Sequence, residues 1–385
     1  QGEVVLITLQ FQDFSTLLTS LSVYDVLTLF LYLRIDSVFF SYFCNIDSKL
    51  YTTMKQRILL FGLMLVGAVT FAQSPEEKGL STINRSSAEA TIGFLASDEL
   101  QGREAGFHGS YVSSEYIASI LQWMGIQPLN ESYFQPFDAY RKERQKKGRL
   151  EVHPDSVAKL KQEVHQKLSM RNVLAMIPGK NTKEYVIVGA HFDHLGIDPA
   201  LDGDQIYNGA DDNASGVSAV LQIARAFLAS GQQPERNVIF AFWDGEEKGL
   251  LGSKYFVQTC PFVSQIKGYL NFDMIGRNNK PEQPKHVVYF YTAAHPSFGD
   301  WLKKDIKKYG LQLEPDYRAW DNPVGGSDNG TFAKAGIPII WYHTDGHPDY
   351  HQPSDHADRL NWDKIVEITK ASFLNMWKMA NEASW

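Results

Sequence analysis

Acidic and imidazole side chains follow the ends of several apolar segments in the second half of the chain. His191-Phe192-Asp193-His194 follows the run EYVIVGA, Asp244-Gly245-Glu246-Glu247 follows NVIFAFW, and Asp273 follows GYLNF. A further imidazole, His351, stands in the loop after IPIIWYH. Clustered carboxylates repel one another and raise one another's pKa unless a positive charge lies among them. The set therefore indicates a cation-binding site.

Two adjacent carboxylates, Asp211 and Asp212, stand in the stretch YNGADDNASG, directly before the helical pattern VSAVLQIARAF. Taken alone, this stretch is typical of a solvated helix N-cap, because Asp and Asn side chains accept the first unpaired N–H groups of a helix. A carboxylate at this place could also bridge two metals. The neighbouring acids and imidazoles favour the second interpretation.

Imidazole nitrogen combined with carboxylate oxygen, without thiolate, suits catalytic zinc better than structural zinc. A site with two metals about 3.5 to 4 Å apart needs one carboxylate to bridge them and terminal ligands on each side. One imidazole and one carboxylate for each metal, plus a shared Asp, can be drawn from His191, Asp212, Glu247, Asp273 and His351. We therefore expect two Zn²⁺ ions per chain.

The remaining acids have natural supporting roles. The spacing of two between His191 and Asp193 places both side chains on one face of an extended strand end, so Asp193 can orient the imidazole. Glu246, beside Glu247 in the turn DGEEKG, is free to act as the general base.

Alternating strand and helix patterns predict a layered α/β fold, in which ligands bind at the carboxyl ends of the strands. The expected strands are NVLAMIPG, EYVIVGAHFD, NVIFAFWD, GYLNFDMIG, HVVYFYTA and IPIIWYHT. Helical spacing at 76–125 indicates outer helices, with the Gly-rich segment 101–110 between them as a structural turn. The polar section 133–170 is expected to form an excursion from the main body.

Composition argues against a nucleic-acid partner. The formal net charge is -7 and the isoelectric point is about 5.9, whereas a nucleic-acid surface calls for a basic stripe. The densest basic run, RKERQKKGR at 141–149, is expected to be a solvated helix or loop.

The N-terminal part differs from the rest. Met54 begins MKQRILLFGLMLVGAVTFAQS, which is typical of a secretory signal peptide cleaved after Ala72, and it is short for a membrane span. Residues 1–53 are expected to be a spurious or non-native upstream segment, with an N-terminal membrane anchor as the alternative. We therefore predict a signal peptide at 54–72, a single catalytic domain at 73–385, and a secreted or periplasmic protein without a stable membrane span. The oligomeric state does not follow from the sequence.

The segments GAHFDHLG, GADDNASG, WDGEEKGLLGS, NFDMIG, GGSDNGTFAKAGIP and YHQPSDHADRL resemble the successive motifs of the co-catalytic di-zinc aminopeptidases of clan MH. The resemblance covers roughly residues 172–361. It implies a mixed central sheet between helices and hydrolysis of peptide substrates. It also implies these roles: His191 and Asp273 on one zinc, Glu247 and His351 on the other, Asp212 as the bridge, Glu246 as the base and Asp193 as support for His191. Many relatives carry His where this chain has Asn329, and no protease-associated insert fits between 133 and 170.

Several alternatives remain open. The chain lacks both the G-x-S-x-G turn of serine hydrolases and the H-E-x-x-H helix of single-zinc proteases. A glutaminyl cyclase-like acyltransferase and a non-catalytic binding protein on the same fold are the rival functions, and the acidic run 198–212 could hold calcium. Two further histidines, His194 and His347, are candidates for substrate contact; the others are expected to be surface or packing residues.

Overall fold

The computed structural model describes residues 73–142, 149–320 and 326–385, and Gln73–Trp385 forms one compact unit. The upstream segment 1–53 and the signal peptide expected at 54–72 lie outside the described residues. Within the described part, no helix is both long and apolar enough to cross a membrane.

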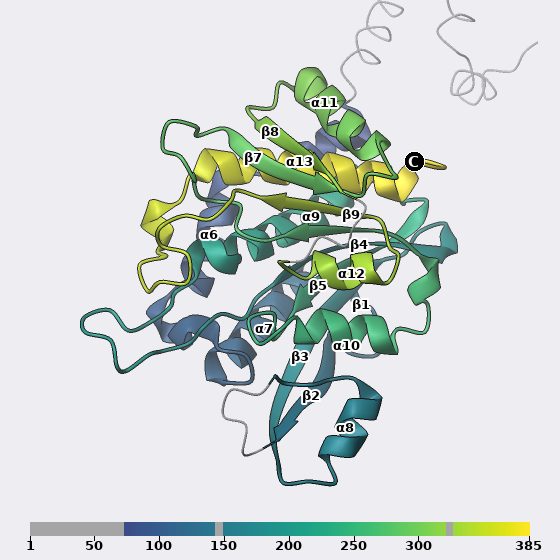
Figure 1. Ribbon diagram of the computed structural model, residues 1–385. Helices are drawn as coiled ribbons and strands as arrows, with labels where there is room; N and C mark the ends of the chain where they lie inside the picture. The colour runs from purple at the N-terminus through teal and green to yellow at the C-terminus, as the bar shows by residue number, and fades with distance from the viewer. Residues whose placement is uncertain (1–72, 143–148, 321–325) are drawn as a thin grey trace, which may run out of the picture. The chain divides into compact units, whose positions relative to one another are not determined.

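A mixed β-sheet forms the centre of this unit (Figure 1). Its strand order is β1-β3-β5-β4-β6-β9-β7-β8, and β2 pairs with β3 off this path. The pairs β5–β4, β4–β6 and β6–β9 are parallel, whereas β3 and β7 run antiparallel to their neighbours β5 and β9. The strands are β1 Gln127–Pro128, β2 Phe134–Lys142, β3 His165–Ile177, β4 Asn181–His191, β5 Arg236–Trp243, β6 Ile266–Phe272, β7 His286–Tyr291, β8 Glu314–Ala319 and β9 Ile339–His343. All the expected strands are confirmed.

The sheet is buried on both faces because its strands are apolar at successive positions. In β4, Val186 and Val188 belong to the core on one face, while Ile187 belongs to the core on the other. Strand side chains alternate between faces, so a continuous apolar run predicts a strand covered on both sides. Full burial of each such side chain contributes roughly 1.5 to 3 kcal/mol.

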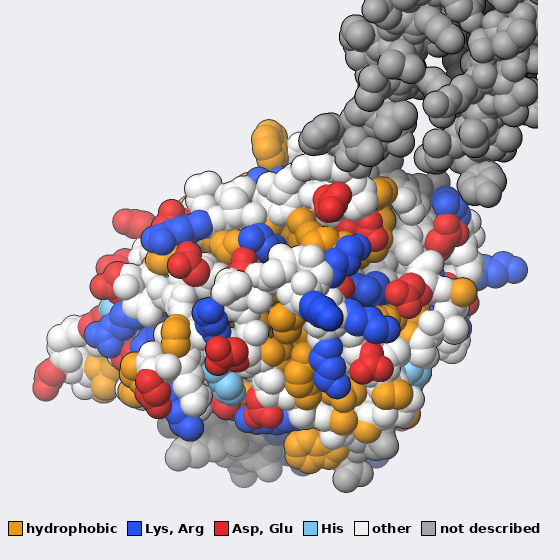
Figure 2. Space-filling model, turned by 90° about the horizontal axis from the view of Figure 1, so that it is seen from above, with side chains coloured by type: hydrophobic (Ala, Val, Ile, Leu, Met, Phe, Trp, Pro, Cys, Tyr) orange, Lys and Arg blue, Asp and Glu red, His pale blue; other side chains and the backbone are white. Residues whose placement is uncertain are grey.

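Helices cover both faces of the sheet, which confirms the expected α/β class with flanking helices (Figure 1). The larger core lies under α6, α7, α9, α11 and α13, and the smaller one under α10 and α12. The helices are α5 Pro75–Leu80, α6 Arg85–Leu95, α7 His108–Trp123, α8 Pro154–Leu160, α9 Gly216–Ser230, α10 Leu251–Thr259, α11 Ser297–Tyr309, α12 Asn329–Lys334 and α13 Trp362–Asn381. Short helical turns lie at Asp98–Arg103, Ala210–Ser215, Val263–Gln265 and Ala357–Arg359. On the face over α11, basic and acidic side chains are interspersed (Figure 2).

The polar section 133–170 is more regular than expected. Residues 134–142 pair with 165–173 in an antiparallel register, so this section forms a β-hairpin that continues the main sheet. Along the chain, α8 connects the two strands of this hairpin, and in space it lies at the end of the sheet farthest from α11 (Figure 1). Hydrophobic patterning missed β2 because this strand has only three buried positions and the polar, half-buried Asp138 interrupts them.

The parallel strands β5, β4, β6 and β9 end at one edge of the sheet, because neighbouring strands in register run the same way. The segments that follow them carry the acids and imidazoles singled out from the sequence. The fold therefore delivers these side chains to a common rim, as the rule for open α/β sheets predicts.

Candidate metal centre

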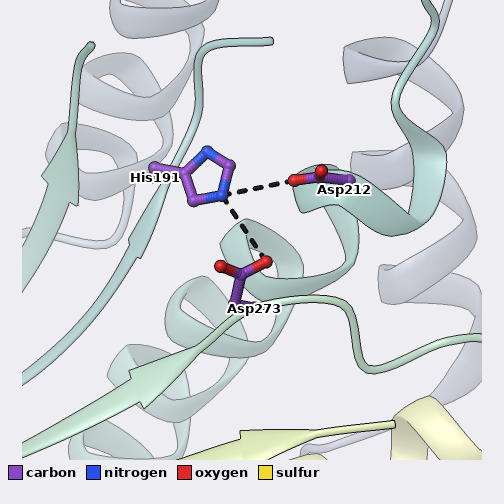
Figure 3. Close-up of side chains that lie close together, drawn as sticks. All are labelled: His191, Asp212 and Asp273. Atoms are coloured by element: carbon purple, nitrogen blue, oxygen red, sulfur yellow. Dashed lines mark ion pairs between the residues drawn. The ribbon is translucent and has the colours of Figure 1, made fainter. Parts of the chain in front are cut away.

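Three buried side chains from separate segments meet at this rim (Figure 3). The Nε2 atom of His191, at the end of β4, lies 3.3 Å from Oδ1 of Asp212 and 3.6 Å from Oδ1 of Asp273. These residues are 1%, 2% and 7% exposed respectively. One imidazole nitrogen and two carboxylate oxygens thus converge in a space closed to solvent.

A second group shares the Asp212 carboxylate. The Nε2 atom of His351 lies 3.2 Å from Oδ2 of Asp212 and 3.2 Å from Oε2 of Glu247. The two oxygens of Asp212 therefore face different imidazoles, His191 on one side and His351 on the other. All five residues expected as ligands are brought together.

His194 also reaches the second group, and the sequence had given it no ligand role. Its Nδ1 atom lies 2.8 Å from Oε1 of Glu247 and 3.9 Å from Oδ2 of Asp212, and its ring is buried. Strand alternation would direct His194 away from His191. That rule ends with β4 at His191, so only the fold beyond the strand end places His194 here.

The turn before α9 explains why Asp212 is available to the site. The helix begins at Gly216 without a side-chain cap from Ser215, and the Oδ1 atom of Asn213 accepts the N–H of Gly216. Asp211 and Asp212 therefore do not cap this helix, whereas Asn213 of the same stretch accepts its first N–H, as the N-cap interpretation expected.

The same turn is held from behind by a carboxylate that the sequence had not indicated. The Oδ2 atom of Asp355 accepts the N–H groups of Asp211 and Asp212 at 3.0 and 3.1 Å. Asp211 itself points away from the ligand groups, because its Oδ1 accepts the N–H of Gly276 and its Oδ2 lies 3.2 Å from Nε2 of His347. His347 is thus engaged with Asp211 in the buried interior.

Asp193 contacts more than the histidine it was expected to orient. The Nδ1 atom of His191 lies 3.2 Å from the main-chain oxygen of Asp193 and 3.7 Å from its Oδ1. The Asp193 carboxylate accepts the N–H of Glu246 at 3.0 Å and that of Glu247 at 3.3 Å. It thereby fixes the turn that carries the expected base and one expected ligand.

The electrostatics of the rim match this arrangement. Burial raises the pKa of Glu246 well above its ordinary value, and the nearby charge of Asp273 acts in the same direction. Burial alone would also raise the pKa of Asp212, but the neighbouring imidazoles of His191 and His351 bring it well below its ordinary value. A raised pKa makes the Glu246 carboxylate a stronger proton acceptor, and a lowered pKa keeps negative charge on Asp212, as acid–base and bridging roles require.

The residues present fit a pair of divalent cations. The buried Nε2 of His191 and Oδ1 of Asp212 form no hydrogen bond within the described part of the chain. Unpaired buried polar atoms cost free energy, and a cation between them would satisfy both. The donor set of imidazole nitrogen and carboxylate oxygen suits zinc. Over the described ranges, the groups able to hold a cation lie at this rim, and Asp212 is the only acid of the run 198–212 that they include.

Several known proteins are similar to this chain in sequence. The sequence model of Peptidase family M28 matches residues 172–375. Leupeptin-inactivating enzyme 1 of Streptomyces exfoliatus is 34% identical over 170 residues, which are 44% of this chain and 34% of that protein. An aminopeptidase of Pseudomonas aeruginosa is 39% identical over 155 residues, 40% of this chain and 24% of that protein. The chain thus matches about a third and a quarter of the length of these curated relatives.

A solved structure shares the fold. The crystal structure of BSAP, a zinc aminopeptidase from Bacillus subtilis, superposes with a TM-score of 0.60 at 16% sequence identity. The superposition covers 79% of this chain and 97% of that one.

Proposed function

Because the chain belongs to peptidase family M28, we propose that it is a zinc-dependent exopeptidase, and specifically an aminopeptidase that removes N-terminal residues from peptides. One observation carries the proposal. The Asp212 carboxylate faces a separate imidazole with each oxygen, His191 at 3.3 Å and His351 at 3.2 Å, which is the arrangement a bridging ligand requires.

Two Zn²⁺ ions would be held by residues already in place. His191 and Asp273 would bind one ion, Glu247 and His351 the other, and Asp212 both. When bound, such a pair polarises a peptide carbonyl and makes a water molecule acidic enough to attack near neutral pH.

Glu246 would move the proton. With its pKa raised by burial, its carboxylate takes the proton of the attacking water and returns it to the leaving amine. The Asp193 carboxylate, through the N–H groups of Glu246 and Glu247, holds base and ligand in one fixed turn.

The variant Glu246→Gln tests the assignment, since it keeps the shape of the side chain and removes its ability to accept a proton. We expect two zinc ions per chain by elemental analysis and a loss of turnover of at least about 100-fold, the contribution typical of a general base. Glu99→Gln, at an exposed position, is the control. Retained activity in Glu246→Gln would refute the role of the base.

Substrate panels separate the candidate functions. An aminopeptidase cleaves aminoacyl amides with a free amino group and not their acetylated forms, whereas a carboxypeptidase requires a free carboxyl terminus and cleaves N-acetylated peptides. A glutaminyl cyclase converts N-terminal glutaminyl peptides into pyroglutamyl products without hydrolysis. A binding protein turns over none of these and holds less than one zinc per chain.

Export is a separate proposal. We propose that a signal peptide at 54–72 directs the protein out of the cytoplasm and that the mature chain begins near Gln73. Intact-mass measurement on protein from its native source tests this. A mature chain that retains residues before Met54 would contradict it and favour the membrane anchor.

A further inference from the structure

A fully buried arginine lies directly behind the metal centre. Arg103 is 0% exposed and stands at the end of the turn Asp98–Arg103. Its guanidinium donates to main-chain carbonyls, and none of its ion pairs or hydrogen bonds within the described residues reaches a carboxylate. The acceptors are the oxygens of Leu95, Phe192, Asn208, Gly209 and Asp212. A guanidinium has five N–H donors in a rigid plane, so this set uses its full capacity.

The acceptors are concentrated in the two segments that carry the expected ligands. Nε donates to Phe192, between His191 and Asp193, at 2.8 Å. Nη1 donates to Asn208 at 2.6 Å, and Nη2 to Gly209 at 2.9 Å and to Asp212 at 3.4 Å. One rigid group therefore links the loop after β4 to the turn before α9.

The fit around the guanidinium is close. A Cβ atom on Gly209 would lie 2.2 Å from the main-chain oxygen of Asp212, 2.6 Å from the ring of His194 and 2.8 Å from Nη2 of Arg103, so a side chain at Gly209 would force this turn to shift. Gln101 and Arg103 have positive φ angles of 52° and 50°, which L-residues adopt at a cost of roughly 1 to 2 kcal/mol each. Such strain persists where the surrounding structure fixes it, often at functional sites.

The charge of Arg103 is also suited to its place. Burial lowers its pKa to about 10, while the negative charges of Asp212, Asp355 and Asp193 act in the opposite direction. The guanidinium is therefore protonated at neutral pH. It places a permanent positive charge behind a rim of carboxylates that otherwise repel one another.

We propose that Arg103 is a positioning residue that sets the distance between His191 and Asp212 and keeps the two loops assembled before metal binds. The inference rests on the proposed function, since the loops matter only if they bind metal. It assigns a role to the segment 101–110, which the sequence indicated only as a structural turn.

Zinc affinity of two Arg→Lys variants tests this role. Arg103→Lys keeps a positive charge but loses the rigid fork. Arg236→Lys is the control, because Arg236 is also buried and donates away from the metal rim, to the carboxylate of Glu184 and to the main-chain oxygens of Met379, Glu382 and Ala383. The metal-free proteins are titrated with zinc alone against a chelating indicator, and their melting temperatures are recorded with and without zinc.

We expect Arg103→Lys to bind zinc roughly 10- to 100-fold more weakly than the wild type, the range seen when groups that orient metal ligands are lost. Arg236→Lys should lower the melting temperature and leave zinc affinity within about threefold. Arg103→Met, which also removes the charge, should bind zinc more weakly than Arg103→Lys. Equal loss of stability in both Lys variants with unchanged zinc affinity would overturn the inference and leave Arg103 as an ordinary core residue.

A second variant addresses the same contact if Arg103→Lys does not fold. Arg103→Gln keeps a planar group with two N–H donors but loses the five-donor fork and the charge, so it should also weaken zinc binding; unchanged affinity there would count against the inference. If the wild type binds less than one zinc per chain, the proposed function and the inference both fail. If the wild type binds two and the variants bind equally well, the inference alone fails.

Discussion

The Asp193 carboxylate accepts the main-chain N–H of Glu246 at 3.0 Å, so a residue of the first rim segment fixes the backbone of the expected base. The variant Asp193→Asn can accept only one of the two N–H groups that the carboxylate accepts now. The NH₂ group of the new asparagine would face the other main-chain N–H, and two donors cannot form a hydrogen bond with each other. We expect turnover to fall by about 10- to 100-fold, as for other groups that orient metal-site residues.

Asp244→Asn is the control for that variant. Asp244 is equally buried at the same rim, but it accepts from Arg171 N and Ser110 Oγ and not from the N–H groups of Glu246 and Glu247. Steady-state kinetics and zinc content of both variants are compared. A similar loss of turnover in the two would show that the effect is general destabilisation.

The two imidazoles beside Glu247 can be assigned by zinc stoichiometry. If His351 is the ligand and His194 orients Glu247 through its 2.8 Å contact, His351→Ala should hold one zinc per chain. His194→Ala should still hold two, with weaker affinity. Elemental analysis after gentle dialysis distinguishes the variants, and the reverse pattern would make His194 the ligand.

Removal of metal should destabilise the fold. Without cations, the carboxylates at the rim repel one another across short distances. A ligand present at 1,000 times its dissociation constant stabilises a protein by about 4 kcal/mol, which for a domain of this size is on the order of 10 °C in melting temperature. Scanning calorimetry with and without a chelator measures the difference. In Asp273→Ala, we expect the difference in melting temperature with and without the chelator to be at most half of that in the wild type.

Lys364 gives a pH dependence that is separate from the metal centre. This residue is 2% exposed at the start of α13, and burial lowers its pKa to about 8. Between pH 8 and the ordinary pKa of 10.5, the unfolded chain binds the proton and the folded chain releases it, so this group makes stability rise with pH over that window. The gain is at most about 3 kcal/mol.

The variant Lys364→Met should lack this rise and should be more stable than the wild type near pH 7. Urea unfolding at pH 7.5 and pH 10 measures the change for each protein. Lys370→Met, on the same helix with a partly exposed side chain, is the control and should follow the wild type. Parallel pH profiles for the wild type and Lys364→Met would contradict the assignment.

The sequence predicted those parts of the structure that depend on local periodicity. Apolar runs such as residues 184–190 indicate strands buried on both faces, and the ends of parallel strands meet at one edge whatever the detailed packing. Since His191, Asp273 and Glu247 follow such ends directly, their meeting place could be inferred without coordinates.

Other parts of the site depend on contacts between distant segments, which no local pattern encodes. Arg103 lies in a Gly-rich turn that looks merely structural, and only the fold carries its guanidinium to Phe192 and Asp212. Asp355 is separated from the N–H groups it accepts by more than a hundred residues of chain.

The hydrogen bonds between the Asp355 carboxylate and the turn at Asp212 also bear on when the site can form during synthesis of the chain. Asp355 and His351 lie near the C-terminus, after β9, while Asp212 precedes most of the sheet. A nascent chain therefore contains Asp212 long before His351 and Asp355 have been synthesised. The proposed loading with metal would therefore follow the synthesis of these residues, and a fragment that ends before His351 would have neither the His351 imidazole nor the Asp355 carboxylate.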